Sequence, residues 1–67
     1  MSDTSRVAVA DDHPRFRAGV VMSLREEDGI EVVGDAADGS AALALARAEL
    51  PDVMVLDINM PGGGLET

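Results

Sequence analysis

Three short strand-type segments, separated by stretches long enough for a helix, constrain the fold of this chain most strongly. Residues 7–10 and 53–56 are continuous apolar runs, which are typical of strands buried on both faces of a parallel sheet. Residues 30–36 are rich in β-branched side chains, with Glu31 and Asp35 between them, and form the other strand candidate. The order strand–helix–strand–helix–strand with short links predicts an α/β fold with a parallel sheet.

The first helix is expected to begin at Pro14, because proline lacks an N–H that the first helical position does not need. Phe16, Val20 and Leu24 recur at i, i+4 and i+8 and are predicted to form its buried stripe. The turn residues at positions 28 and 29 end this helix.

The second helix is predicted over residues 41–50, after capping residues at 38–40 and before Pro51, which stops it. Its apolar positions extend nearly all the way round, so the sequence assigns it no buried face. Crossovers between parallel strands are right-handed in nearly all proteins. If residues 7–10 form the middle strand, the order is second–first–third, with one helix on each face.

Acidic residues follow two of the predicted strands. Asp11 and Asp12 come directly after the first strand, and Asp57 follows the third. Ligands bind at the carboxyl ends of adjacent strands where the strand order reverses. Three carboxylates at one edge repel one another unless a cation compensates, and Mg²⁺ prefers such oxygen ligands. A carboxylate beside this ion can attack a phosphoryl group and form an aspartyl phosphate.

Each residue also has a simpler interpretation. Asp12 could cap the helix that Pro14 opens, and Asp57 could be an ordinary turn residue at a strand end. His13 is interpreted as a solvated residue at a helix start, not as a ligand or a base. Met54 and Met60 are expected to pack rather than to carry chemistry. Because the topology makes the two acidic strand ends adjacent, the functional interpretation is favoured.

Composition limits the partners. The net charge is −8, with 13 acidic against 5 basic residues and no lysine, so this segment lacks the positive face that binds nucleic acid directly. A cation or a basic protein surface is the expected partner. No cysteine is available for a disulfide.

The ends of the chain show no targeting signal. Residues 1–5 are polar and are predicted to be a disordered tail, without a signal peptide. The longest apolar run, residues 41–46, is far shorter than the ~18 residues of a membrane span. A cytoplasmic protein without membrane contact is therefore expected. Residues 58–67, with three consecutive glycines, are predicted to be a loop after the third strand.

Nearly the whole chain from Arg6 onward resembles CheY-like receiver domains of response regulators, of the kind carried by NarL/LuxR-type transcription regulators. The resemblance rests on four ordered segments: VADDHP at 9–14, FRAGV at 16–20, VVGDAADG at 32–39 and PDVMVLDINMPGGG at 51–64. It implies a truncated flavodoxin-like βαβαβ fold and a phosphoacceptor in a two-component phosphorelay, not an enzyme. Residues 1–67 would be the N-terminal portion of a single receiver domain.

The resemblance also implies roles for individual residues. Asp57 would accept a phosphoryl group from a sensor histidine kinase. Asp12 would ligate Mg²⁺ directly, Asp11 would assist through water, and Asn59 would contribute its backbone carbonyl. The pair at 60–61, Met60 and Pro61, would shape the loop beside the site.

A complete receiver has two further strands, one ending in Ser or Thr and the other in Lys, and this subgroup adds a DNA-binding output domain. Without them, the third strand would be a bare apolar edge, which invites pairing with another chain. We therefore expect the isolated chain to fold weakly or to form a homodimer through that edge.

Two alternatives stay open. The chain could be a truncated fragment without a signalling role. It could also be a phosphatase with an aspartyl nucleophile, although such enzymes need a second Asp two residues on, where Asn59 stands. A Rossmann nucleotide-binding half is disfavoured, because no G-x-G-x-x-G follows the first strand.

Overall fold

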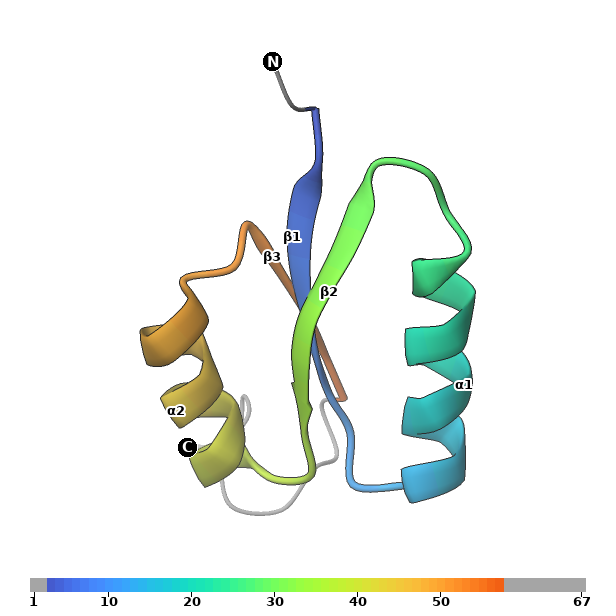
Figure 1. The fold of residues 1–67 in the computed structure, drawn as a ribbon. Helices are drawn as coiled ribbons and strands as arrows, with labels where there is room; N and C mark the ends of the chain where they lie inside the picture. Colours follow the sequence, from blue (N-terminus) through green and yellow to red (C-terminus); the bar gives the residue numbers. More distant parts are fainter. Residues whose placement is uncertain (1–2, 58–67) are drawn as a thin grey trace.

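A computed structural model describes residues 3–57. The elements in chain order are β1 (Ser5–Ala10), α1 (Pro14–Arg25), β2 (Ile30–Ala36), α2 (Gly39–Glu49) and β3 (Val53–Leu56). The three strands form one parallel sheet in the order β2-β1-β3. The sheet stands between the two helices, with α1 on one face and α2 on the other (Figure 1). The predicted α/β fold, its strand order and the placement of one helix on each face are confirmed.

β1 is the centre of the core. Residues 7–10 are between 0% and 5% exposed, because this strand has a neighbour on each edge and a helix over each face. Its pairing with β2 shifts register between Val7 and Ala8, so that Val33 is an extra residue on β2. The next residue, Gly34, lies where α2 comes close to the sheet. A Cβ built there would lie 2.6 Å from Leu45 Cδ1.

The buried face of α1 differs from the predicted one. Val21 is the buried residue of this helix, whereas Phe16 is 64% exposed and Leu24 is half-buried. α1 packs against β1 and β2, while Phe16 and Val20 line a groove that opens toward β3. The prediction is wrong for Phe16, because no described element covers this part of the groove.

α2 begins at Gly39 and ends at Glu49, so the predicted range of 41–50 is slightly displaced. Asp38 is its N-cap and accepts a hydrogen bond from the Ala41 N–H at 2.8 Å. At the other end Leu50 takes a left-handed conformation (φ 48°), and its N–H donates to the Ala46 carbonyl. The helix therefore stops at Glu49, two residues before Pro51.

The chain enters the sheet earlier than predicted. β1 begins at Ser5, whose N–H donates to the Gly29 carbonyl at 2.8 Å, so the predicted disordered tail of residues 1–5 is too long. The expected burial of the third strand on both faces is also wrong. Val53 is 50% exposed and Val55 is 40% exposed, because α1 packs against β1 and β2 and leaves their face of β3 uncovered by described residues.

The predicted loop at 58–67 lies outside the described residues. Within residues 3–57, neither helix has the length and apolar character needed to cross a membrane.

Candidate functional site

The candidate site lies where β1 and β3 end side by side. The Asp57 N–H donates to the Ala10 carbonyl at 3.0 Å, and the Asp11 N–H donates to the Ala36 carbonyl at 3.0 Å. These two bonds extend the sheet ladder by one residue beyond each strand, so the positions of both aspartates are set by backbone pairing. The predicted adjacency of the two acidic strand ends is thereby confirmed.

Four side chains converge there, those of Asp11, Asp12, His13 and Asp57. Each offers one ligand atom, and these atoms all lie within 4.8 Å of one another. Asp11 is buried, Asp12 and Asp57 are partly buried, and His13 is exposed. The cluster is therefore anchored from the core side and open to solvent above.

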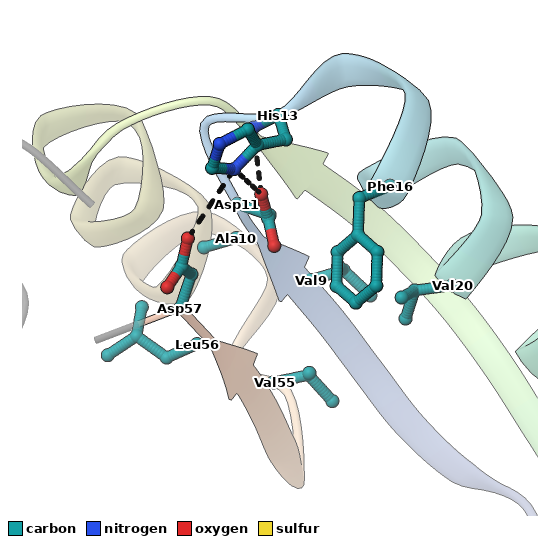
Figure 2. Close-up of a pocket in the computed structure, with 9 residues that line it drawn as sticks. All are labelled: Val9, Ala10, Asp11, His13, Phe16, Val20, Val55, Leu56 and Asp57. Carbon is teal, nitrogen blue, oxygen red and sulfur yellow. Dashed lines mark hydrogen bonds and ion pairs between the residues drawn. The ribbon is translucent and has the colours of Figure 1, made fainter. Parts of the chain in front are cut away.

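His13 is the member that sequence reasoning missed. Its ring is 71% exposed, yet Nδ1 lies 2.9 Å from Asp12 Oδ1, 3.3 Å from Asp11 Oδ1 and 3.9 Å from Asp57 Oδ2. Figure 2 shows the ring poised between Asp11 and Asp57. The signal in the sequence was its place directly after the paired acids, on a loop too short to carry it away from them.

The loop between β1 and α1 is held by hydrogen bonds to its backbone. Asp11 Oδ1 accepts the His13 N–H at 2.7 Å, and the Asp11 carbonyl accepts a hydrogen bond from Arg17 Nη1 at 2.8 Å. Arg17 Nε in turn lies 3.4 Å from Asp35 Oδ2 on β2. These contacts fix the direction in which the paired acids leave β1.

The simpler interpretation of Asp12 as a helix cap is wrong. The N-cap of α1 is His13, and its side chain makes no capping hydrogen bond. Asp12 Oδ1 is buried and accepts no hydrogen bond from any described residue. His13 Nδ1 lies 2.9 Å away but without hydrogen-bond geometry. Burying an unsatisfied carboxylate oxygen is costly, and a cation would compensate it. The donor set therefore fits a hard divalent ion.

An apolar groove of about 280 Å³ leads to this cluster. Its walls are Val9, Ala10, Phe16, Val20, Val55 and Leu56, and Asp11, His13 and Asp57 stand at one end (Figure 2). Three further residues of the predicted site, Asn59, Met60 and Pro61, lie outside the described residues.

Residues 7–67 match the family model of the response regulator receiver domain. The chain belongs to this family. Among curated receiver-containing relatives, a protein assigned as the transcriptional regulatory protein NarL of Mycobacterium tuberculosis is 58% identical over 57 residues, which cover 85% of this chain. The response regulator GacA of Pseudomonas viridiflava is 48% identical over 62 residues, covering 91% of the chain.

Solved receiver structures agree in fold. The signal receiver domain assigned to NarL of Mycobacterium tuberculosis superposes with a TM-score of 0.87 at 54% identity, over 91% of this chain and 49% of that one. RcsB of Salmonella enterica serovar Typhimurium gives a TM-score of 0.83 at 31% identity, over 91% of this chain and 32% of that one. The chain spans 26% of the NarL relative and 29% of the GacA relative.

Proposed function

We propose that this chain is the phosphoacceptor module of a two-component signalling system, in which Asp57 takes a phosphoryl group from the phosphohistidine of a sensor kinase. The observation that carries the proposal is the convergence of Asp11, Asp12 and Asp57, with His13, within 4.8 Å at the ends of β1 and β3. In a receiver-family chain, these acids occupy the edge of the sheet where a phosphoryl group would meet a cation.

Each acid has a distinct part in this proposal. Asp12, whose buried Oδ1 lacks a hydrogen bond from the described residues, ligates Mg²⁺ directly, and Asp11 assists through a water molecule. Asp57 and the backbone carbonyl of Asn59 complete the protein ligands, beside the loop of Met60 and Pro61. When bound, Mg²⁺ offsets the negative charge shared by the carboxylates and the incoming phosphoryl group.

The transfer itself uses one carboxylate oxygen. An Asp57 oxygen attacks phosphorus, and the phosphorus–nitrogen bond of the kinase phosphohistidine breaks, with its electron pair returning to the imidazole ring. The product is an aspartyl phosphate on this chain. The chain is thus a substrate that takes part in its own modification, and not an enzyme with turnover on other molecules.

The relatives suggest what the phosphorylated chain controls. NarL is assigned as a transcriptional regulatory protein, and the RcsB structure is described as bound to a promoter in the presence of phosphomimetic BeF₃⁻. We propose that this receiver likewise controls a DNA-binding output domain in the cytoplasm. With a net charge of −8 and no lysine, the segment itself would not hold DNA.

The direct test is incubation with a small acyl phosphate and Mg²⁺, followed by intact mass spectrometry. Wild type is expected to gain one phosphoryl group, and Asp57→Asn none, because the amide cannot act as the nucleophile. Chelation of Mg²⁺ should also prevent the gain. Asp28→Asn is the matched control, since Asp28 is exposed in the turn before β2, and it should behave as wild type.

Phosphorylation of Asp57→Asn to the wild-type extent would contradict the proposal. So would continuous hydrolysis of a phosphomonoester by the wild-type chain, which would instead favour the aspartyl-nucleophile phosphatase.

A further inference from the structure

We infer that His13 is a direct ligand of the cation at this site, so that the site takes an imidazole-accepting transition ion such as Zn²⁺ in addition to Mg²⁺. The inference deepens the proposed function and rests on it for the position of the cation. It adds a nitrogen donor to a site otherwise described by oxygen ligands, and it makes His13 the residue that discriminates between metals.

The spacing of the donor atoms carries the inference. Ligands about 2.1 Å from a metal ion lie about 3.0 Å apart at right angles and about 3.4 Å apart in a tetrahedron. The His13 Nδ1 lies 2.9 Å and 3.3 Å from the nearest oxygens of Asp12 and Asp11, and 3.9 Å from that of Asp57. The ring nitrogen thus already stands at ligand-to-ligand separations from Asp12 and Asp11. Its 3.9 Å distance to Asp57 Oδ2 is below the ~4.2 Å that two opposite ligands at ~2.1 Å from one ion span.

The His13 backbone is fixed on both sides. Its N–H donates to Asp11 Oδ1 at 2.7 Å, and its carbonyl accepts the Arg17 N–H at 2.8 Å in the first turn of α1. The backbone therefore holds the ring beside the carboxylates, although 71% of the side-chain surface is exposed to solvent. A donor positioned by its backbone loses little conformational freedom when it binds a metal.

The chemistry of the donors predicts which ions gain from this residue. A neutral imidazole ring that carries its proton on Nε2 presents a lone pair at Nδ1. Imidazole nitrogen suits Zn²⁺, Cu²⁺ and Ni²⁺, whereas Mg²⁺ keeps to oxygen ligands and water. The carboxylates of Asp11, Asp12 and Asp57 can bind either kind of ion. His13 adds affinity only for the ions that accept imidazole nitrogen.

The test uses the fact that the chain contains one histidine. In the ¹⁵N-labelled 67-residue chain, long-range ¹H–¹⁵N spectra report Nδ1 and Nε2 of His13 separately. Addition of Zn²⁺ is expected to shift the Nδ1 resonance to the metal-bound range while Nε2 stays protonated. Addition of Mg²⁺ is expected to leave Nδ1 outside that range. A Zn²⁺ titration that leaves Nδ1 unshifted overturns the inference without any variant being needed.

Affinities of variants give a second readout by calorimetry. His13→Ala should weaken Zn²⁺ binding by at least about tenfold, since even loss of an outer-shell partner costs that much. The same variant should change Mg²⁺ affinity by less than about twofold, because Mg²⁺ does not use the nitrogen. Asp12→Asn removes a carboxylate that both ions would use, so it should weaken the binding of Zn²⁺ and of Mg²⁺.

Two calorimetric results would also overturn the inference. Unchanged Zn²⁺ affinity in His13→Ala would remove the ring from the coordination sphere. Tighter Mg²⁺ binding in that variant would mean that the ring occupies the cation position instead of serving the cation. Neither result affects the phosphorylation assay on Asp57, so failure of this inference is distinguishable from failure of the proposed function.

Discussion

Gly29 is the described residue whose backbone most limits substitution. It closes the turn before β2 with φ of +85°, a region that side chains with a Cβ rarely adopt. Its carbonyl accepts the Ser5 N–H at 2.8 Å, so the same residue fixes the point where β1 enters the sheet. A single glycine thus couples a turn to the first strand pair.

We expect Gly29→Ala to destabilise the chain by about 1 kcal/mol, because the left-handed conformation costs an L-residue about that much. Gly19→Ala is the matched control: Gly19 lies within α1 with nothing within 4 Å of an added Cβ. There the substitution should stabilise the chain by about 0.5–1 kcal/mol through higher helix propensity. Urea unfolding followed by far-ultraviolet circular dichroism measures both. Equal effects of the two substitutions on stability would contradict the left-handed conformation assigned to Gly29.

At the scale of the elements, the two helices begin in different ways. α2 has a side-chain cap, since Asp38 accepts the Ala41 N–H at 2.8 Å. α1 has none, because its N-cap His13 turns its ring toward the acidic cluster and Asp11 accepts the His13 N–H. The start of α1 therefore forms part of the acidic cluster, whereas the start of α2 is stabilised by a side-chain cap.

We expect Asp38→Ala to lower the free energy of unfolding by about 1 kcal/mol, because the Ala41 N–H loses its acceptor. Ser40→Ala serves as the control. Ser40 is exposed within α2 and forms no part of the cap, so replacing it should leave stability unchanged or slightly raised. The urea midpoint of each variant reports the difference. If Ser40→Ala lost as much stability as Asp38→Ala, the assignment of Asp38 as the N-cap of α2 would be wrong.

At the scale of the whole molecule, the core is thin. The buried hydrophobic residues among those described are valines and alanines, and Val9 is the largest side chain that is fully buried. Larger apolar side chains stay outside, among them Phe16 at 64% and Leu50 at 75% exposed. A chain of 67 residues with so little large apolar burial has a small margin of stability.

The outer edge of β3 is the place where a second copy of the chain could extend the sheet. This edge has no partner among the described strands, and Val53 and Val55 are 50% and 40% exposed. We propose that the 67-residue chain self-associates through this edge. The net charge of −8 opposes association, so added salt should strengthen it by screening.

Sedimentation velocity over a range of concentrations measures this association. Wild type should sediment faster as concentration and salt rise, and Val55→Lys should stay monomeric, because a charge on an exposed edge strand blocks pairing. Met22→Lys is the control, since Met22 is 64% exposed on α1 and lies away from β3. A concentration-independent monomer with a sharp unfolding transition would rule the association out.

The order of elements could be predicted from the sequence, because apolar runs, a proline at a helix start and turn residues act locally. The same local signals identified Asp11, Asp12 and Asp57, since the end of each strand is marked by its last apolar residue. Once the first strand was taken as the middle one, the placement of one helix on each face followed from the handedness of crossovers, which is a property of any parallel sheet.

Other features depended on the tertiary structure. Phe16 and Val20 are spaced as residues on one face of a helix. Whether Phe16 is buried depends on how far the sheet extends under α1, and no local sequence pattern determines that. His13 looked like a solvated residue because its neighbours in the sequence do not reveal that Asp57 arrives beside it from a strand 44 positions later. Side-chain identity and spacing act over one turn or one strand, whereas burial and site membership are set by whichever segments the sheet brings together.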